Sequence, residues 1–326
     1  MSQPTFQLRI AVVGAGHLGQ HHARIAAASP HAASVVVVEP SEARGREIAA
    51  KHGAEWAPDL ASVLGRIDAV QIAAPTGLHL ALGLEALAAG KHILMEKPLA
   101  AGLEEGEALL RALASARAAH PALVAAVGHL ERFNPAVVAL RAAKFRPRFV
   151  EAVRVSPFPM RSTEVDVVMD VMIHDLDLLL ALMGRPVIDV EAFGVPVLTP
   201  HPDLVNARLK FEGGAFATVT ASRVAQKKER TLRAFGDKAY AKLDFAAQKL
   251  ELLRLVLGPG GPEVAPEVVD IEEGEPLKLE IEAFHAACLG LGDEVVTWSE
   301  GLEAMRVADL VQKAVARSLD AIGSGA

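Results

Sequence analysis

The chain has 326 residues, of which 51% are hydrophobic and 22% charged, and its formal net charge is -7. This length exceeds the size of one hydrophobic core and predicts two domains, while the acidic balance excludes the basic stripe of a nucleic-acid-binding protein. No apolar run is long enough to cross a bilayer or to act as a signal peptide, so a cytoplasmic protein is expected. The single cysteine, Cys288, excludes an internal disulfide, and its apolar helical surroundings favour a buried, unreactive thiol.

Residues 1–127 alternate short apolar runs with amphipathic, alanine-rich segments. Strands without polar alternation are typical of a parallel sheet that is covered on both faces. The alternation of strands and helices therefore predicts an α/β domain of the Rossmann type, with a doubly wound parallel sheet. The predicted strands are Arg9–Val13, Val35–Val38, Ala69–Ile72, His92–Met95 and Leu123–Val127, and the predicted helices are Leu18–Ala28, Ser41–Lys51, His79–Ala89 and Leu103–Ala119.

Residues 128–326 form strands that follow one another with short connections, which predicts an α+β domain with an open, largely antiparallel sheet. A helix is predicted at Pro135–Ala143 and a longer one at Val165–Met183, which Gly184 ends. Gly213-Gly214 predicts a hairpin turn. The predicted strands are Phe149–Ser156, Val187–Val195, Val205–Phe211, Ala215–Ser222, Thr231–Phe235 and Ala239–Asp244; Gly258–Pro262 is a predicted surface loop, and further helices begin at Leu277 and Gly301.

The segment Gly14-Ala15-Gly16-His17-Leu18-Gly19 follows the first strand and opens a helix, which is the context that gives a G-x-G-x-x-G motif its meaning. Its glycines let the backbone approach a pyrophosphate, and the amides and dipole of the helix N-terminus favour that anion. Glu39 ends the second strand, where a carboxylate can accept hydrogen bonds from the adenosine ribose and would repel a 2′-phosphate. NAD is therefore predicted as the cofactor, and the alternative is a glycine turn with a solvent-facing glutamate.

The next two strand ends carry further candidates. Ala74, Pro75 and Thr76 follow the third strand at the edge where the cofactor is expected, and His79 comes shortly after them. The alternative makes Thr76 a helix cap and places His79 in the first helical turn.

Glu96-Lys97-Pro98 follows the fourth strand, and the proline fixes the turn. Glu96 and Lys97 are predicted to contact the cofactor. Lys97 can also stabilise negative charge on a substrate oxygen, although a surface lysine in a turn explains the pattern equally well.

The predicted helix Val165–Met183 carries Asp170, His174 and Asp177 among apolar residues, at a spacing that places all three on one face of an α-helix. Burying three polar groups without a purpose is costly. A histidine beside a carboxylate can act as a general base toward a hydroxyl group. One histidine is too few for a typical metal site, so no metal is expected. The helix dipole explains Asp170 in part but not His174.

Five motifs in order resemble the glucose–fructose oxidoreductase / inositol dehydrogenase / MocA (Gfo/Idh/MocA) family: Gly14–Gly19, Glu39, Glu96–Pro98, Gly128–Pro135 and Asp170–Asp177. The resemblance spans nearly the whole chain. It implies an NAD-binding Rossmann domain at 1–127, then a substrate-binding domain at 128–326 that forms dimers or tetramers. It also implies that Lys97 and His174 flank the reacting carbon with Asp170 in support. The family often has tyrosine at the position of His129, so this histidine receives no role.

Within the family, Glu131–Pro135, Ser156–Phe158 and Asp170–Leu180 are similar to the branch that oxidises the 3-hydroxyl of UDP-N-acetylglucosamine for the synthesis of 3-amino sugars of lipid A. A diphosphate needs cationic partners, which favours arginines as substrate contacts. The predicted substrate contacts are Arg132, Asn134, Arg161, Asp177 and Arg223.

Three other functions are alternatives to a UDP-sugar dehydrogenase. They are a dehydrogenase of a free sugar, inositol or other cyclic polyol, a non-enzymatic NAD-binding sensor, and a reductase of a non-sugar ligand such as a tetrapyrrole.

Overall fold

The computed structural model describes residues 6–158, 166–258 and 260–323, which form two compact units. The first unit comprises Met1–Leu130 and Glu275–Leu302, and the second comprises Glu131–Gly274 and Glu303–Ala326. Two consecutive domains were predicted, whereas the first unit takes up a later segment of the chain. Burial of apolar side chains holds that segment in the first unit, because Ile281 and Phe284 are fully buried in one core cluster with Leu94 and Ala126.

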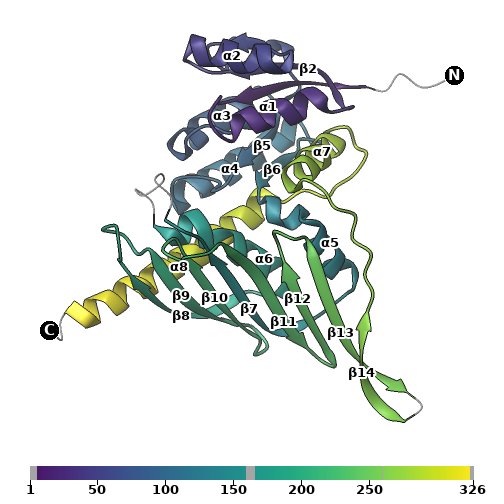
Figure 1. The fold of residues 1–326 in the computed structure, drawn as a ribbon. Coiled ribbons are helices and arrows are strands. Elements are labelled where there is room, and N and C mark those ends of the chain that lie inside the picture. Colours follow the sequence, from purple (N-terminus) through teal and green to yellow (C-terminus); the bar gives the residue numbers. More distant parts are fainter. Residues whose placement is uncertain (1–5, 159–165, 259, 324–326) are drawn as a thin grey trace. The chain divides into compact units, whose positions relative to one another are not determined.

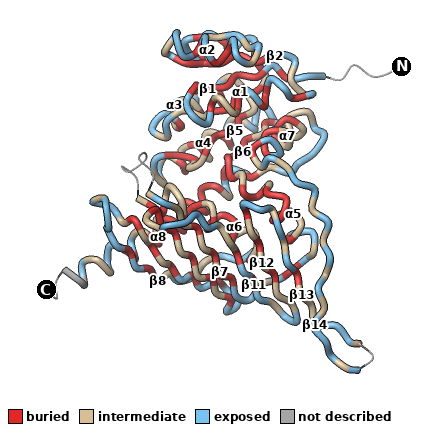
Figure 2. Tube along the Cα trace, in the orientation of Figure 1, coloured by how far each residue is buried: buried red, intermediate tan, exposed pale blue. Residues whose placement is uncertain are grey.

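The first unit contains a six-stranded parallel sheet in the order β3-β2-β1-β4-β5-β6, which confirms the predicted Rossmann-type sheet (Figure 1). Only β3 has no counterpart in the prediction, because three residues are too few to show a pattern. Figure 2 shows that the central strands are buried over most of their length, as expected for a sheet covered on both faces. The strands are β1 (Leu8–Val13), β2 (Ala32–Val38), β3 (Glu55–Ala57), β4 (Ala69–Ile72), β5 (His92–Glu96) and β6 (Ala125–Gly128).

Helices connect these strands close to where the pattern predicts them. In addition, α7 (Pro276–Cys288) lies beside β5 and β6 although it is distant in the sequence (Figure 1). Burial raises the pKa of the Cys288 thiol at the end of α7, in agreement with an unreactive cysteine. The other helices are α1 (Gly19–Ala28), α2 (Glu42–His52), η1 (Leu64–Arg66), η2 (Thr76–Leu78), α3 (His79–Ala88) and α4 (Leu103–Ala119).

The second unit contains an eight-stranded sheet in the order β14-β13-β12-β11-β7-β10-β9-β8. Only β7 and β10 pair in parallel among its described strands, so the predicted open, largely antiparallel sheet is confirmed. Gly213 and Gly214 have positive φ values and form the predicted hairpin turn. The strands are β7 (Pro147–Val155), β8 (Val187–Val195), β9 (Leu204–Phe211), β10 (Phe216–Ser222), β11 (Glu229–Gly236), β12 (Ala239–Asp244), β13 (Lys249–Gly258) and β14 (Gly261–Glu267).

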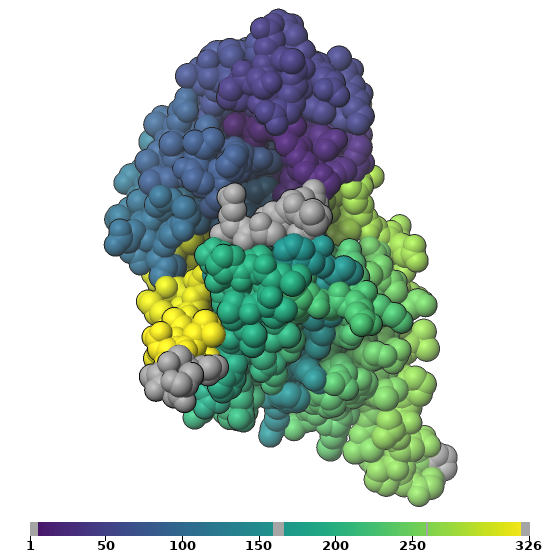
Figure 3. Space-filling model, turned by 60° about the vertical axis from the view of Figure 1, so that its left-hand side comes forward, coloured from purple at the N-terminus to yellow at the C-terminus, as the bar shows by residue number. Residues whose placement is uncertain are grey.

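The prediction missed β13 and β14 and assigned a loop to Gly258–Pro262, where the two strands in fact meet as a hairpin. Pro262 and Pro266 lie in β14, which is an edge strand and can therefore contain proline. Figure 3 shows this hairpin, in lime green, projecting from the rest of the second unit.

One face of this sheet is covered by α5 (Pro135–Ala142), α6 (Ile173–Met183) and the part of α8 (Trp298–Gly323) that belongs to the second unit. Their apolar residues share one core cluster with alternate residues of the strands, for example Leu140, Leu176 and Val311 with Val150. Across the described residues, the helices lack the combination of length and apolar character that spanning a membrane requires.

Candidate active site

The loop between β1 and α1 has the close packing that only glycine allows. Gly14 has a φ of 100°, and a Cβ on it would lie 2.6 Å from the carbonyl oxygen of Ala73. A Cβ on Gly19 would lie 1.9 Å from the carbonyl oxygen of Gly14, so α1 can begin this close to the loop only with glycine there.

The other side of this loop is open. Apart from Gly16 and its two chain neighbours, no described residue comes within 4 Å of the position that a Cβ on Gly16 would take. Gly16, His17 and Leu18 are all exposed. The backbone at Gly16 is therefore accessible to a ligand at the start of α1, where free amide groups favour an anion.

Glu39 is buried, so the alternative of a solvent-facing glutamate is wrong. Its Oε2 accepts a hydrogen bond from the backbone N–H of Ala15 at 3.0 Å, and its Oε1 accepts one from the N–H of Ser41 at 3.1 Å. The Nη2 atom of Arg44 lies 3.4 Å from Oε1. These contacts fix the carboxylate beside the glycine loop, and each oxygen keeps a lone pair that can accept from a ribose hydroxyl.

The turns after β4 and β5 are joined by His79. Its ring nitrogens lie 3.1 Å from the carbonyl oxygen of Ala74 and 2.9 Å from that of Pro98, and the ring is buried. His79 therefore holds the two turns together, which makes it a positioning residue. Thr76 begins η2, and neither of the flanking cap positions has a side-chain hydrogen bond, so the predicted capping role for Thr76 is not seen.

Lys97 follows the last residue of β5, and the peptide bond to Pro98 is cis. The backbone N–H of Lys97 donates to Glu96 Oε2 at 3.2 Å. Glu96 is buried and Lys97 is partly exposed. The lysine thus stands at the carboxyl edge of the parallel sheet, where ligands of this fold bind.

The continuous helix predicted at Val165–Met183 is wrong in its first part. Val165 lies outside the described residues, Val168–Met172 forms the π-helix η4, and α6 follows and ends at Gly184 in the left-handed conformation. Such wide turns are frequent at functional sites. Asp170 on η4 and His174 on α6 are both partly exposed, whereas Met172 and Ile173 between them are buried.

Two buried ion pairs hold α6 in place. Arg132 binds both carboxylate oxygens of Asp177 at 2.7 Å. Arg154 binds the two oxygens of Asp175 at 2.9 and 2.8 Å and donates to Glu131 Oε1 at 2.6 Å. No role was predicted for Arg154 and Asp175, since an isolated arginine in a strand gives no signal of its partner.

Four of the five predicted substrate contacts have partners inside the second unit. Asn134 caps α5 by accepting from the N–H of Ala136 at 3.1 Å, a role that its position before a proline could have indicated. Arg223 is 1% exposed, and its Nε donates to Asp203 Oδ1 at 2.7 Å.

Arg132 and Asp177 form the buried pair described above, so all four side chains have partners within the second unit, and their contact with a substrate stays a prediction. Arg161 lies outside the described residues. His129, for which the sequence indicated no role, is buried in the first unit just after β6.

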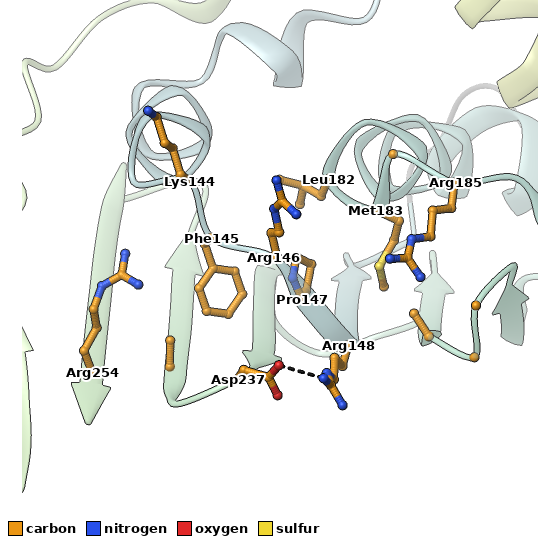
Figure 4. Close-up of a pocket in the computed structure, with 15 residues that line it drawn as sticks. Lys144, Phe145, Arg146, Pro147, Arg148, Leu182, Met183, Arg185, Asp237 and Arg254 are labelled. Carbon is orange, nitrogen blue, oxygen red and sulfur yellow. Dashed lines mark hydrogen bonds and ion pairs between the residues drawn. The ribbon is translucent and has the colours of Figure 1, made fainter. Parts of the chain in front are cut away.

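A basic cavity of about 830 Å³ lies at the opposite end of α6 from His174 (Figure 4). Arg146, Arg148 and Arg185 line it, and Arg148 pairs with Asp237 at 2.6 Å. Because the side chains of this last pair are 75% and 73% exposed, the cavity is an open surface feature. It contains none of the predicted catalytic residues.

The order β3-β2-β1-β4-β5-β6, with a glycine loop after β1 and a carboxylate at the end of β2, defines a dinucleotide-binding dehydrogenase fold. The open backbone at Gly16 and the fixed carboxylate of Glu39 fit NAD.

The comparisons with known proteins agree. The model of an oxidoreductase family with an NAD-binding Rossmann fold, Gfo/Idh/MocA, matches residues 8–120, and the model of the Gfo/Idh/MocA C-terminal domain matches residues 146–242. The chain belongs to the Gfo/Idh/MocA family of NAD-dependent oxidoreductases.

Two curated relatives illustrate the range of the family. A UDP-N-acetylglucosamine 3-dehydrogenase of Acidithiobacillus ferrooxidans is 40% identical over 280 residues, which cover 85% of this chain and 87% of the relative. A scyllo-inositol 2-dehydrogenase (NAD(+)) of Bacillus subtilis is 31% identical over 238 residues, which cover 67% of this chain and 68% of the relative.

Solved structures show the same architecture. A UDP-N-acetylglucosamine 3-dehydrogenase from Acidithiobacillus ferrooxidans matches with a TM-score of 0.88 at 36% identity, covering 96% of this chain and 99% of that one. A levoglucosan dehydrogenase in complex with NADH and levoglucosan matches with a TM-score of 0.83 at 20% identity, covering 96% and 98%, which shows the shared fold.

Gly16 allows a direct test of where the dinucleotide binds. Gly16→Ala is expected to leave the melting temperature unchanged, because the new methyl group meets no protein atom. It is expected to weaken NAD binding by at least about fivefold, since overpacking costs roughly 1–3 kcal/mol. Calorimetric titration with NAD measures the affinity. Gly65→Ala, at an equally open position on η1, is the matched control, and NAD affinity equal to that of the parent in Gly16→Ala contradicts the assignment.

Proposed function

We propose that this protein oxidises the 3-hydroxyl of UDP-N-acetylglucosamine to a ketone. The main support is the similarity to a dehydrogenase of that name, which extends over 85% of this chain and 87% of the relative. The second support is chemical: Lys97, Asp170 and His174 supply a cation, a carboxylate and a base, which are the groups that such a reaction uses.

In the proposed mechanism, His174 takes the proton of the substrate hydroxyl while hydride leaves the same carbon. NAD supplies the hydride acceptor. Lys97 stabilises the alkoxide that develops on the oxygen, and Asp170 orients the lysine and the histidine. The resulting 3-keto sugar is suited to an aminotransferase, which would make the 3-amino sugar of lipid A.

The site of the diphosphate needs a new assignment in this proposal. Arg132 and Arg223 are engaged by Asp177 and Asp203, so we leave them out of the proposed contacts. Arg44 beside Glu39 and the exposed glycine loop are assigned to the dinucleotide. Lys97, Asp170 and His174 remain the proposed residues at the sugar.

The experiment is a panel of UDP-sugars incubated with the purified protein and NAD, with the absorbance of NADH as the signal. We expect reduction with UDP-N-acetylglucosamine and none with UDP alone. The panel is repeated with 2-oxoglutarate, which reoxidises NADH if the cofactor is recycled in place. No signal with any UDP-sugar, together with reduction by a free polyol, contradicts the proposal.

A dehydrogenase of inositol or another cyclic polyol is the second candidate, which the similarity to a scyllo-inositol 2-dehydrogenase favours. Titration with UDP separates the two candidates. An enzyme for a nucleotide sugar binds UDP saturably, whereas a polyol enzyme has no group that recognises it.

We also propose that the protein forms a homo-oligomer in the cytoplasm, where NAD and nucleotide sugars are available. The face of the sheet opposite the helices carries Phe149 stacked on Phe235 at 5.7 Å, and Phe235 beside Tyr240 at 5.1 Å. Exposed aromatic clusters of this kind are typical of subunit interfaces. Light scattering on the purified protein measures its oligomeric state, and a monomer at all concentrations contradicts this proposal.

A further inference from the structure

A row of hydrogen-bonded polar side chains crosses the core of the first unit behind Lys97. His22 Nε2 lies 2.8 Å from Glu96 Oε1, and His22 Nδ1 lies 3.0 Å from Gln71 Oε1. These three side chains come from α1, β5 and β4, and the last two are neighbouring strands of the sheet. Glu96 is thereby connected on one side to the backbone of Lys97 and on the other to the interior of the sheet.

The row continues to α7. Gln71 Nε2 lies 2.8 Å from His285 Nε2, and His285 Nδ1 lies 3.0 Å from Ser29 Oγ. Ser29 Oγ donates to Glu282 Oε2 at 3.0 Å. We call these six side chains the core network: Glu96, His22, Gln71, His285, Ser29 and Glu282.

The core network is almost entirely closed to solvent. His22, Gln71 and His285 are 0% exposed and Glu96 is 4% exposed, whereas the side chain of Glu282 is 23% exposed. Strands of a doubly wound sheet are normally apolar on both faces. Polar groups in such a place are expensive unless every donor meets an acceptor, so the proton positions in the network are strongly constrained.

The proton positions can be derived one by one from the exposed end of the core network, at Glu282. An ionised carboxylate only accepts, so the hydroxyl proton of Ser29 points to Glu282, and His285 Nδ1 must donate to Ser29 Oγ. Burial is the main cause that lowers the pKa of His285 to about 3, so this ring is neutral and carries one proton. His285 Nε2 is then an acceptor for the amide of Gln71.

The same counting fixes the other end. With its N–H₂ group turned to His285, Gln71 presents its oxygen to His22, and His22 Nδ1 must donate to it. The bond between His22 Nε2 and Glu96 Oε1 then needs one further proton. A neutral histidine beside an ionised glutamate cannot supply it.

We propose that His22 and Glu96 hold this extra proton between them at neutral pH. The orientation of Gln71 and His285 keeps the proton there. His22 is therefore a positioning residue that offsets the charge of Glu96 beside Lys97. The role in turnover rests on the function proposed above. Because His22 balances the charge of Glu96, this carboxylate does not cancel the positive potential of Lys97, which can then stabilise the developing alkoxide.

The charges around Glu96 favour its ionised form. Burial raises the pKa of Glu96, but the hydrogen bond and charge of His22, followed by Lys97, outweigh it, so the pKa of this carboxyl lies below its usual range. His21 on α1 and His285 on α7 also interact electrostatically with His22. His285 is neutral, so Glu96 is the carboxylate that balances the imidazolium.

The experiment is ¹⁵N NMR of the full chain labelled at histidine, with the His22 signals identified by their loss in His22→Gln. We expect both ring nitrogens of His22 to be protonated at pH 7.5. In His285→Leu, Gln71 can turn its N–H₂ group to His22. We then expect His22 to lose its second proton at a pH about one unit or more below that of the parent protein, because the shift corresponds to the free energy of one charge-assisted hydrogen bond. Ser29→Ala is expected to shift this pH in the same direction. It is the second network variant and keeps the test decisive if His285→Leu does not fold.

His52→Leu, a histidine on α2 outside the core network, is the matched control and leaves the His22 titration unchanged. A neutral His22 in the parent protein, or an unchanged titration in both network variants, overturns the proposal. Because no substrate is present, this outcome is independent of the proposed function. The effect on turnover is read separately, as a shift of the pH profile of NADH formation by His285→Leu in the same direction as the NMR titration.

Discussion

Replacing His174 or Lys97 by alanine is expected to lower kcat at least about 100-fold while NAD binding persists. Positioned acid–base groups contribute roughly 10²–10⁴-fold to such reactions, and a donor aimed at a developing negative charge contributes a comparable factor. NAD binding persists because the glycine loop and Glu39, which both belong to the first unit, hold the dinucleotide in either variant.

The measurement is the initial rate of NADH formation with a saturating sugar substrate, together with the dissociation constant of NAD for each variant. Lys91→Ala is the matched control for Lys97, because Lys91 precedes β5 and Lys97 follows it. His201→Ala, an exposed histidine of the second unit, is the control for His174. Full turnover in both His174→Ala and Lys97→Ala contradicts the mechanism.

Arg154→Met is expected to destabilise the second unit by about 3–5 kcal/mol, because it leaves two buried carboxylates without their cation. Arg154 binds both oxygens of Asp175 and one of Glu131, and all three side chains are buried. Burial already raises the pKa of Asp175, although Arg154 opposes this effect. Removal of the arginine therefore exposes the full cost of burying the two charges.

Thermal unfolding measures the effect, and a loss of this size lowers the midpoint by at least about 6 °C for a unit of this length. Arg148→Met removes the exposed pair with Asp237 and is the matched control, with a loss of no more than about 1 kcal/mol. The triple variant with Glu131→Gln and Asp175→Asn is expected to recover part of the stability. Equal midpoints for Arg154→Met and Arg148→Met contradict this account.

The Rossmann-type sheet could be predicted from the sequence because parallel strands covered on both faces appear as uninterrupted apolar runs. The glycine loop could be predicted because its motif is contiguous and directly follows such a run, and Glu39 could be predicted because it ends the next run. The short strand β3 gives no such pattern. The packing of α7 onto the first unit depends on contacts between residues about 200 positions apart, for which no local pattern exists.

The partners of the predicted substrate contacts could not be predicted, because an arginine in the sequence does not reveal what it binds. Arg132 and Arg223 appeared suited to a diphosphate, yet each binds an aspartate of the same unit. The π-helix η4 also escaped prediction, since its sequence differs little from that of an α-helix. The core network was missed because His22 and Gln71 look like isolated polar residues in a helix and a strand.

Helix α8 has a consequence for protein engineering. Its first turn belongs to the first unit, where Trp298 Nε1 donates to the carbonyl oxygen of Ala126, and its later turns belong to the core of the second unit. A chimaera that exchanges cofactor modules between relatives by a single crossover after Leu130 would separate Ala126 from this tryptophan and from α7. Such an exchange should carry residues 275–302 along with the N-terminal segment, so that the transplanted module keeps the residues that complete its hydrophobic core.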